Sequence, residues 1–103
     1  MSGAMRQKTQ VLTAVAAATP ILVGDLENVT LQFLGTFATD SITIETSNEP
    51  GESTAVSNWE TVGTAITAVG IETPTGLGKW LRLDKTAGSN AITVHISGTI
   101  KIR

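Results

Sequence analysis

The chain has 103 residues, which is enough for one compact domain with one core and too few for two. It contains no cysteine and a single histidine, so disulfide scaffolds, zinc fingers, thiolate nucleophiles and metal sites built from several histidines are excluded. Charged residues make up only 16% and the net charge is −2, which predicts surface buried against a partner and argues against nucleic acid as that partner.

The first nineteen residues are expected to differ from the rest of the chain, so we divide it into residues 1–19 and a β-domain of residues 20–103. Residues 1–8 are small, polar and basic, and their pattern favours a frayed end. Every odd position from Thr9 to Val15 is β-branched, which favours an extended strand. Residues 1–19 are therefore either the first edge strand or an arm that becomes ordered on a partner.

The next segment has the alternation of two half-buried strands. Residues 28–37 place Val29, Leu31 and Phe33 on one face, and residues 41–47 do the same with Ile42 and Ile44. Turn-forming residues separate the two strands at 38–41. Residues 48–57 contain Pro-Gly and several polar residues, and they predict the longest exposed loop.

The second half of the chain predicts further short strands. We expect strands at 58–62 and 64–69, a glycine-rich loop at 70–78, and a strand at 79–85 with Leu81 and Leu83 inward. Residues 86–90 read as a hairpin connection.

The last strand has the most regular pattern. Branched residues keep one parity over eleven positions, with Gly98 in phase, so its register is expected to be firm: Ile92, Val94, Ile96, Ile100 and Ile102.

Seven or eight short strands with turns between them predict an all-β fold, a single-domain antiparallel β-sandwich of the jelly-roll kind. No apolar run approaches the ~20 residues of a transmembrane helix. The predicted core consists of Leu31, Phe33, Ile42, Ile44, Leu81, Leu83, Ile92, Val94 and Ile96.

Charge is sorted along the chain. Residues 1–24 carry +2, residues 25–78 carry −8 and residues 79–103 carry +4. Acidic and basic strands that pair within one sandwich would give a mixed surface, which is the interpretation we favour. The alternative is a molecule with one acidic and one basic face that meets other copies head to tail.

No arrangement of residues predicts catalysis, a cofactor or a metal site. His95 lies on the polar parity of the last strand and reads as an ordinary surface residue. The acidic pairs Asp25–Glu27 and Glu49–Glu52 lack the dense oxygen ligands of a calcium loop. Trp59 and Trp80 are the best binding candidates: exposed, they would stack on sugar rings; buried, they would fill the core, and we expect burial of at least one.

The order of motifs over roughly residues 28–98 resembles a known family. A strand with Ile42-Thr-Ile-Glu45 is followed by a loop, by Ser57-Asn-Trp-Glu60, by a glycine-containing loop, by Lys79-Trp-Leu-Arg82 and by a last strand from Ala91 to Gly98. This pattern is similar to that of small β-sandwich virion proteins of tailed bacteriophages, above all capsid decoration (cement) proteins.

The resemblance implies a structural protein without enzymatic activity or cofactor, made in the host cytoplasm and carried on the capsid surface of the virion. It also implies a homotrimer bound to the major capsid protein, with no contact to nucleic acid or membrane. A carbohydrate-binding module, or a tail or fibre adhesion module, remains the alternative. The candidate assembly contacts are Arg6, Lys8, Val11, Leu12, Trp80 and Arg82.

Overall fold

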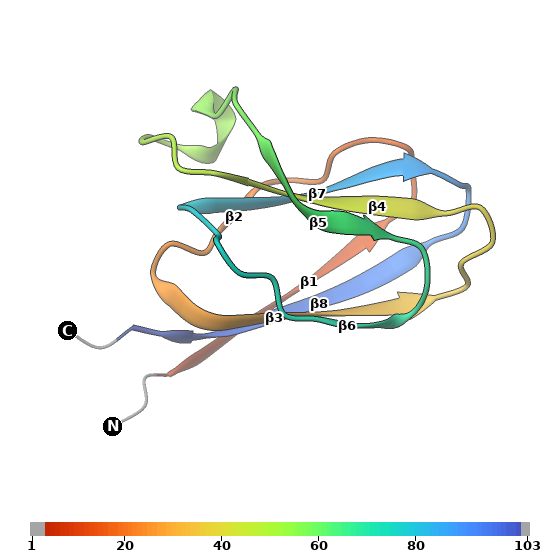
Figure 1. The fold of residues 1–103 in the computed structure, drawn as a ribbon, viewed down its shortest axis with the longest axis horizontal. Coiled ribbons are helices and arrows are strands. Elements are labelled where there is room, and N and C mark those ends of the chain that lie inside the picture. Colours follow the sequence, from red (N-terminus) through yellow and green to blue (C-terminus); the bar gives the residue numbers. More distant parts are fainter. Residues whose placement is uncertain (1–3, 102–103) are drawn as a thin grey trace.

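The computed structural model describes residues 4–101, and they form eight β-strands and one short 3-10 helix, η1 (Ser53–Ala55) (Figure 1). The strands are β1 (Met5–Leu12), β2 (Ile21–Leu22), β3 (Leu26–Gly35), β4 (Ser41–Ser47), β5 (Glu60–Ile66), β6 (Gly70–Glu72), β7 (Trp80–Ala87) and β8 (Ile92–Ile100).

The strands form two four-stranded antiparallel sheets, sheet A with the order β1-β8-β3-β6 and sheet B with the order β2-β7-β4-β5. The chain behaves like one long hairpin, because β1 pairs with β8, β2 with β7, β3 with β6 and β4 with β5. Additional ladders between β3 and β8 and between β4 and β7 roll this hairpin into two layers. This is the jelly-roll arrangement, and it confirms the predicted fold class.

The core lies between the two sheets. All nine predicted core residues are buried, and six more apolar residues join them: Leu12, Ile21, Val23, Leu26, Val29 and Ile66. Strand β8 is central to sheet A, since β1 and β3 flank it, and its inward row Ile92, Val94 and Ile96 is at most 2% exposed. Gly98 continues this row against Leu26, and Ile102 lies outside the described residues.

Three sequence expectations about the connections are wrong. Residues 86–90 do not form a hairpin, because β7 belongs to sheet B and β8 to sheet A. The two strands expected at 58–62 and 64–69 are instead one strand, residues 60–66. It continues through Gly63, whose φ of 71° accommodates a shift in the β4–β5 register. Part of the expected glycine-rich loop is strand β6, whose residues are all exposed.

The start of the chain is more ordered than its composition predicts. Met5–Lys8 were expected to fray, yet they belong to β1, which pairs with β8 along its whole length. The backbone hydrogen bonds between β1 and β8 hold these residues in place, although their side chains are polar and bury little surface. β1 is thus an edge strand of this chain's own sheet A.

A buried ion pair closes one end of the sandwich. Lys85 and Asp40 have fully buried side chains, and Lys85 Nζ lies 3.2 Å from Asp40 Oδ1. Lys85 Nζ also donates to the Asn90 carbonyl, while Asp40 accepts from the backbone N–H groups of Ala38 and Asn90 and from Asn90 Nδ2. The pair therefore joins the β3–β4 and β7–β8 connections, which are two places where the chain passes between the sheets.

Truncation at the centre of β8 tests the core. Val94→Ala removes buried methyl groups between β1 and β3, so we expect it to lower the free energy of unfolding by about 1–3 kcal/mol. Urea denaturation followed by tryptophan fluorescence measures this change. Thr93→Ala, on the opposite face of the same strand, is the matched control, and an equal loss in both variants would contradict the assigned register.

The buried pair predicts a loss of stability in acid. The Ala38 N–H, more than any other donor, stabilises the carboxylate and lowers the pKa of Asp40 from 3.8 to about 2. A depressed folded-state pKa means that the contribution is fully present above about pH 4 and disappears as the pH falls towards 2. Urea midpoints should therefore fall over this range more steeply for the wild type than for Asp40→Asn. Parallel curves would contradict the prediction.

The pair also predicts non-additive substitutions. Lys85→Met leaves the Asp40 carboxylate buried without its cation, so we expect a large drop in the melting temperature. Adding Asp40→Asn removes the unpaired charge and should recover part of the loss. Calorimetry of the two single variants and the double variant gives the coupling, and strict additivity would show that the two groups do not depend on each other.

Candidate interaction surface

The outer face of sheet B carries a cluster of three side chains, those of Trp59, Arg82 and Glu45. We call these three residues and Trp80 the aromatic patch. The β4–β7 register places Glu45 directly opposite Arg82. Arg82 Nε and one terminal nitrogen lie 2.8 and 2.6 Å from Glu45 Oε1, and the guanidinium carbon lies 4.4 Å from the centre of the Trp59 ring. A carboxylate and an aromatic face thus hold the cation in one position.

Trp80 extends this patch towards β2. Its strand neighbour is Leu22, which is 37% exposed, and Lys79 Nζ lies 5.4 Å from the centre of the Trp80 ring. The indole Nε1 is buried and has no hydrogen-bond partner within residues 4–101. Trp59 and Trp80 are both only partly buried, so the expectation that one of them fills the core is wrong. Trp80 has outward parity on β7, and Trp59 precedes β5.

The long loop 48–59 is fixed by Glu49, which thereby positions Trp59. The Glu49 carboxylate accepts hydrogen bonds from the backbone N–H groups of Asn58 at 2.6 Å and Ser57 at 2.8 Å. These donors, that of Asn58 first, lower the pKa of Glu49 because they stabilise its ionised form. Lys79 Nζ adds a bond to the Gly51 carbonyl. Sequence reasoning predicted the loop but not this anchor, because the bonds join residues eight and nine positions apart.

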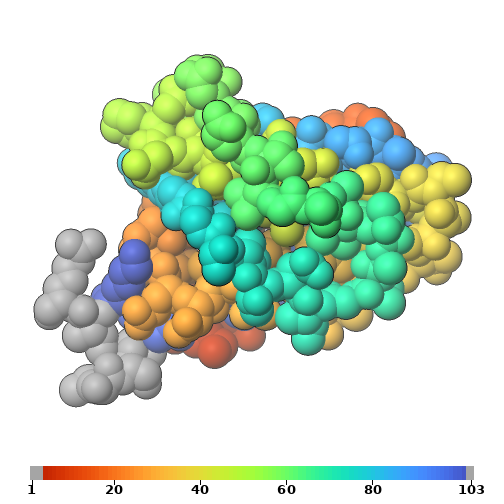
Figure 2. Space-filling view, in the orientation of Figure 1, coloured from red at the N-terminus to blue at the C-terminus, as the bar shows by residue number. Residues whose placement is uncertain are grey.

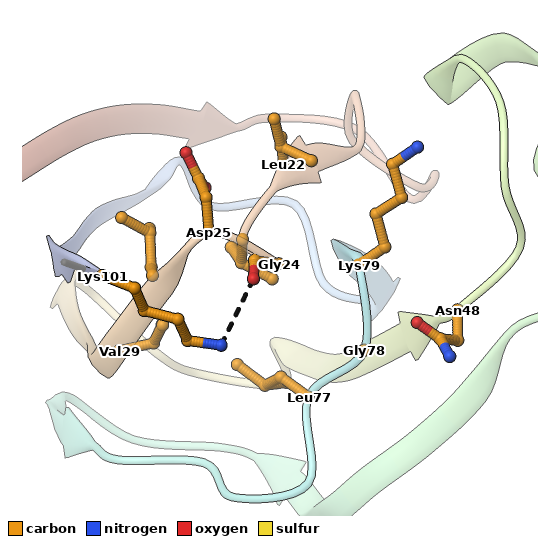
Figure 3. A pocket seen from close by; sticks show the side chains of 11 residues that line it. Leu22, Gly24, Asp25, Val29, Asn48, Leu77, Gly78, Lys79 and Lys101 are labelled. Carbon is orange, nitrogen blue, oxygen red and sulfur yellow. Dashed lines mark hydrogen bonds between the residues drawn. The ribbon is translucent and has the colours of Figure 1, made fainter. Parts of the chain in front are cut away.

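A cleft of about 460 Å³ opens beside the patch, at the end of the sandwich opposite Asp40 (Figure 3). Its walls combine apolar side chains such as Leu77 and Val29 with the polar side chains of Asp25, Asn48 and Lys101. Lys101 reaches into it and donates to the Gly24 carbonyl at 3.3 Å, whereas Lys79 extends to the loop. Both lysines of this cleft are bound to backbone carbonyls, and Asp25 is paired with Arg6, so these charged groups form no convergent set for catalysis.

The outer face of sheet A has a different character. Its side chains are amides, hydroxyls and apolar groups, and only Glu27 and His95 can carry charge. A hollow of about 200 Å³ lies over the middle of this face, and His95 Nδ1 is 2.8 Å from Thr9 Oγ1 within it. Met5, Val11 and Ile71 are at least 57% exposed. No sequence pattern predicted this neutral face, since its residues come from four separate strands.

The six predicted contact residues lie on different parts of the molecule. Trp80 and Arg82 are on sheet B, whereas Arg6, Lys8 and Val11 are on β1 in sheet A. Leu12 is 5% exposed and packs in this chain's own core, so in this conformation it is not available to a partner. Arg6 is paired with Asp25 at 2.8 Å and donates to the Leu22 carbonyl, while Lys8 and Val11 are exposed.

The ion pairs join the oppositely charged parts of the sequence. Within residues 4–101 these are Arg6–Asp25, Arg82–Glu45 and Lys85–Asp40, and each links a basic residue of the terminal blocks to an acid of the middle block. These pairs agree with the interpretation that acidic and basic parts of the chain pair within one sandwich, and Glu45 opposite Arg82 is the pair that joins two strands.

Within the described residues, no three histidine, cysteine or acidic side chains come together in a way that would hold a metal ion. The same part of the chain contains no helix long and apolar enough to cross a membrane. No protein-family model, curated protein or solved structure matches the chain.

Proposed function

We propose that this protein is a structural component of a virus particle, a capsid decoration protein that binds the outer surface of the shell and stabilises it. Support comes from the sequence resemblance and from the jelly roll, an architecture used by viral capsid and lectin domains. Because a fold alone does not assign a function, the aromatic patch carries the proposal.

The aromatic patch has the chemistry of a protein-binding hot spot. Tryptophan and arginine are enriched among residues that dominate binding energy. Glu45 and the Trp59 ring already hold Arg82, whose side chain is 24% exposed, so binding costs little further side-chain entropy. The proposed partner is the major capsid protein. The homotrimer expected from the resemblance stays a prediction, which light scattering decides.

Shell binding tests the patch. Trp59→Ala removes the partly buried ring and Arg82→Ala removes the group stacked on it. Each change should weaken binding to shells at least about tenfold, as for a hot-spot residue. The measurement is co-sedimentation with shells of the virus that encodes the chain, purified without this protein. Thr43→Ala, on the same outer face of β4, is the control.

The competing function is carbohydrate binding through the same tryptophans. In the structure each ring already has a cation over it, Arg82 on Trp59 and Lys79 on Trp80, which reduces the area open for stacking on a sugar. Glycan-array binding that is lost in Trp59→Ala, with no binding to shells, would contradict the decoration function and favour the carbohydrate-binding module. If Trp59→Ala and Arg82→Ala bind shells as strongly as the wild type, the claim that the aromatic patch binds the shell is contradicted.

A further inference from the structure

Strand β1 leaves one side of its backbone without a partner. The Ile100 N–H donates to the Ala4 carbonyl at 2.8 Å, which fixes the alternation of the β1–β8 ladder. The backbone groups of Arg6, Lys8, Gln10 and Leu12 consequently face β8. Those of Met5, Gln7, Thr9 and Val11 face away from the sheet, and no other strand of residues 4–101 covers them.

Among the four edges of the sandwich, β1 is the least protected. β2 and β6 have two and three residues, and β5 is interrupted at Gly63, where its register with β4 shifts. β1 has eight residues, no proline and an unbroken register with β8. Edges of this kind are templates for another strand. The charge of Arg6 is already paired with Asp25, so Lys8 is the one cation on the strand without an ion pair in the structure.

A second copy of β1 fits this edge in one register better than in the others. An antiparallel pair with its two-fold axis at Lys8 would put Lys8 opposite itself, and an axis at Gln7 would put Arg6 opposite Lys8. Like charges directly opposite one another destabilise a sheet. An axis at Thr9 puts Lys8 opposite Gln10, Arg6 opposite Leu12 and Gln7 opposite Val11. It avoids every like-charge pair and keeps a longer overlap than an axis at Gln10.

The same register places a neutral side chain opposite the unpaired cation. With the axis at Thr9, Lys8 of the other copy lies in the non-hydrogen-bonded position opposite Gln10, where side chains approach most closely. The Gln10 amide is held on its own chain, because Nε2 donates to the Thr19 carbonyl at 2.9 Å. The ammonium group of Lys8 therefore meets no like charge across the pair.

We propose that β1 is a self-association site: two copies of this chain pair antiparallel about a two-fold axis at Thr9, with Lys8 of each copy opposite Gln10 of the other. The A sheets of the two copies then join edge to edge into one eight-stranded sheet. Their neutral outer faces lie side by side, so no charges repel each other there. The pairing uses the opposite layer from the aromatic patch and does not depend on what that patch binds.

The first test is the mass in solution. The wild-type chain should have twice the monomer mass by light scattering at high micromolar concentration and dissociate on dilution. Thr9→Pro removes an N–H that points away from β8, so the internal ladder is kept while pairing is blocked, and this variant should remain a monomer. Circular dichroism and thermal melting verify that it is folded. The homotrimer expected from the resemblance, a wild-type monomer, or a dimer that Thr9→Pro leaves intact would each overturn the proposal.

The second test determines the register by disulfide cross-linking. The chain has no cysteine of its own, so a single introduced cysteine can cross-link only to its copy in the other chain. In the proposed pair the two Thr9 Cα atoms form a hydrogen-bonded pair about 5.5 Å apart, within the range of a disulfide. Thr9→Cys should form a covalent dimer on mild oxidation. Gln7 is also exposed on the same strand face, but it lies opposite Val11 in this register, so Gln7→Cys should not form a covalent dimer. Equal cross-linking of both variants, or cross-linking of neither, would refute the register.

Discussion

The buried Asp40–Lys85 pair is the constraint on which the two-layer structure depends most. A jelly roll requires the chain to pass repeatedly from one sheet to the other, and such connections lack the hydrogen bonds of a ladder. Here Asp40 in the β3–β4 connection binds Lys85 at the end of β7 and Asn90 before β8. Gly88 is required in the same place: its φ is +95°, and a Cβ there would lie 2.1 Å from Asp40 Oδ1.

With that end closed, the two sheets present surfaces of different chemistry. Sheet B exposes an arginine and two tryptophans, held by ion pairing and stacking. Sheet A exposes a neutral face and an unprotected edge strand. The segment between β6 and β7 crosses the side of the sandwich between the two sheets (Figure 2). Thr73 and Thr75 in it are exposed, whereas Leu77 packs against the core. The two proposed contacts therefore use the outer face of sheet B and the β1 edge, where regular ladders support the backbone.

Period-two alternation predicted the core because it depends only on neighbouring residues. Leu81, Leu83 and Val94 are buried for the reason that the pattern gave. Lys85 has the same inward parity as Leu81 and Leu83, but we did not predict its burial because a lysine is rarely buried without a partner. Its partner, Asp40, lies far away in the sequence. The connection 86–90 was misread for a related reason. Its turn residues fit a hairpin, and only the ladders of β7 with β4 and of β8 with β3 decide that it crosses between sheets. Trp59, Trp80 and Arg82 were predicted as separate binding candidates and not as a cluster with Glu45. Glu45 and Arg82 meet through the β4–β7 ladder, and Trp59 reaches them from the loop that Glu49 holds.

The two proposed contacts would reinforce each other on a shell. A virus capsid repeats the same subunit surface many times, so a pair of chains joined through β1 presents two aromatic patches to neighbouring copies of one site. The second patch then binds at the effective concentration set by the first, and modest affinity at each patch yields strong retention if the spacing matches. The sheet that β1 would extend is rigid, whereas a flexible arm would spread the two patches over many separations. A mismatch between the spacing of the patches and that of the shell sites would therefore remove the gain entirely, which makes the geometry of the β1 pair, rather than the strength of either contact, the property that selects one lattice over another.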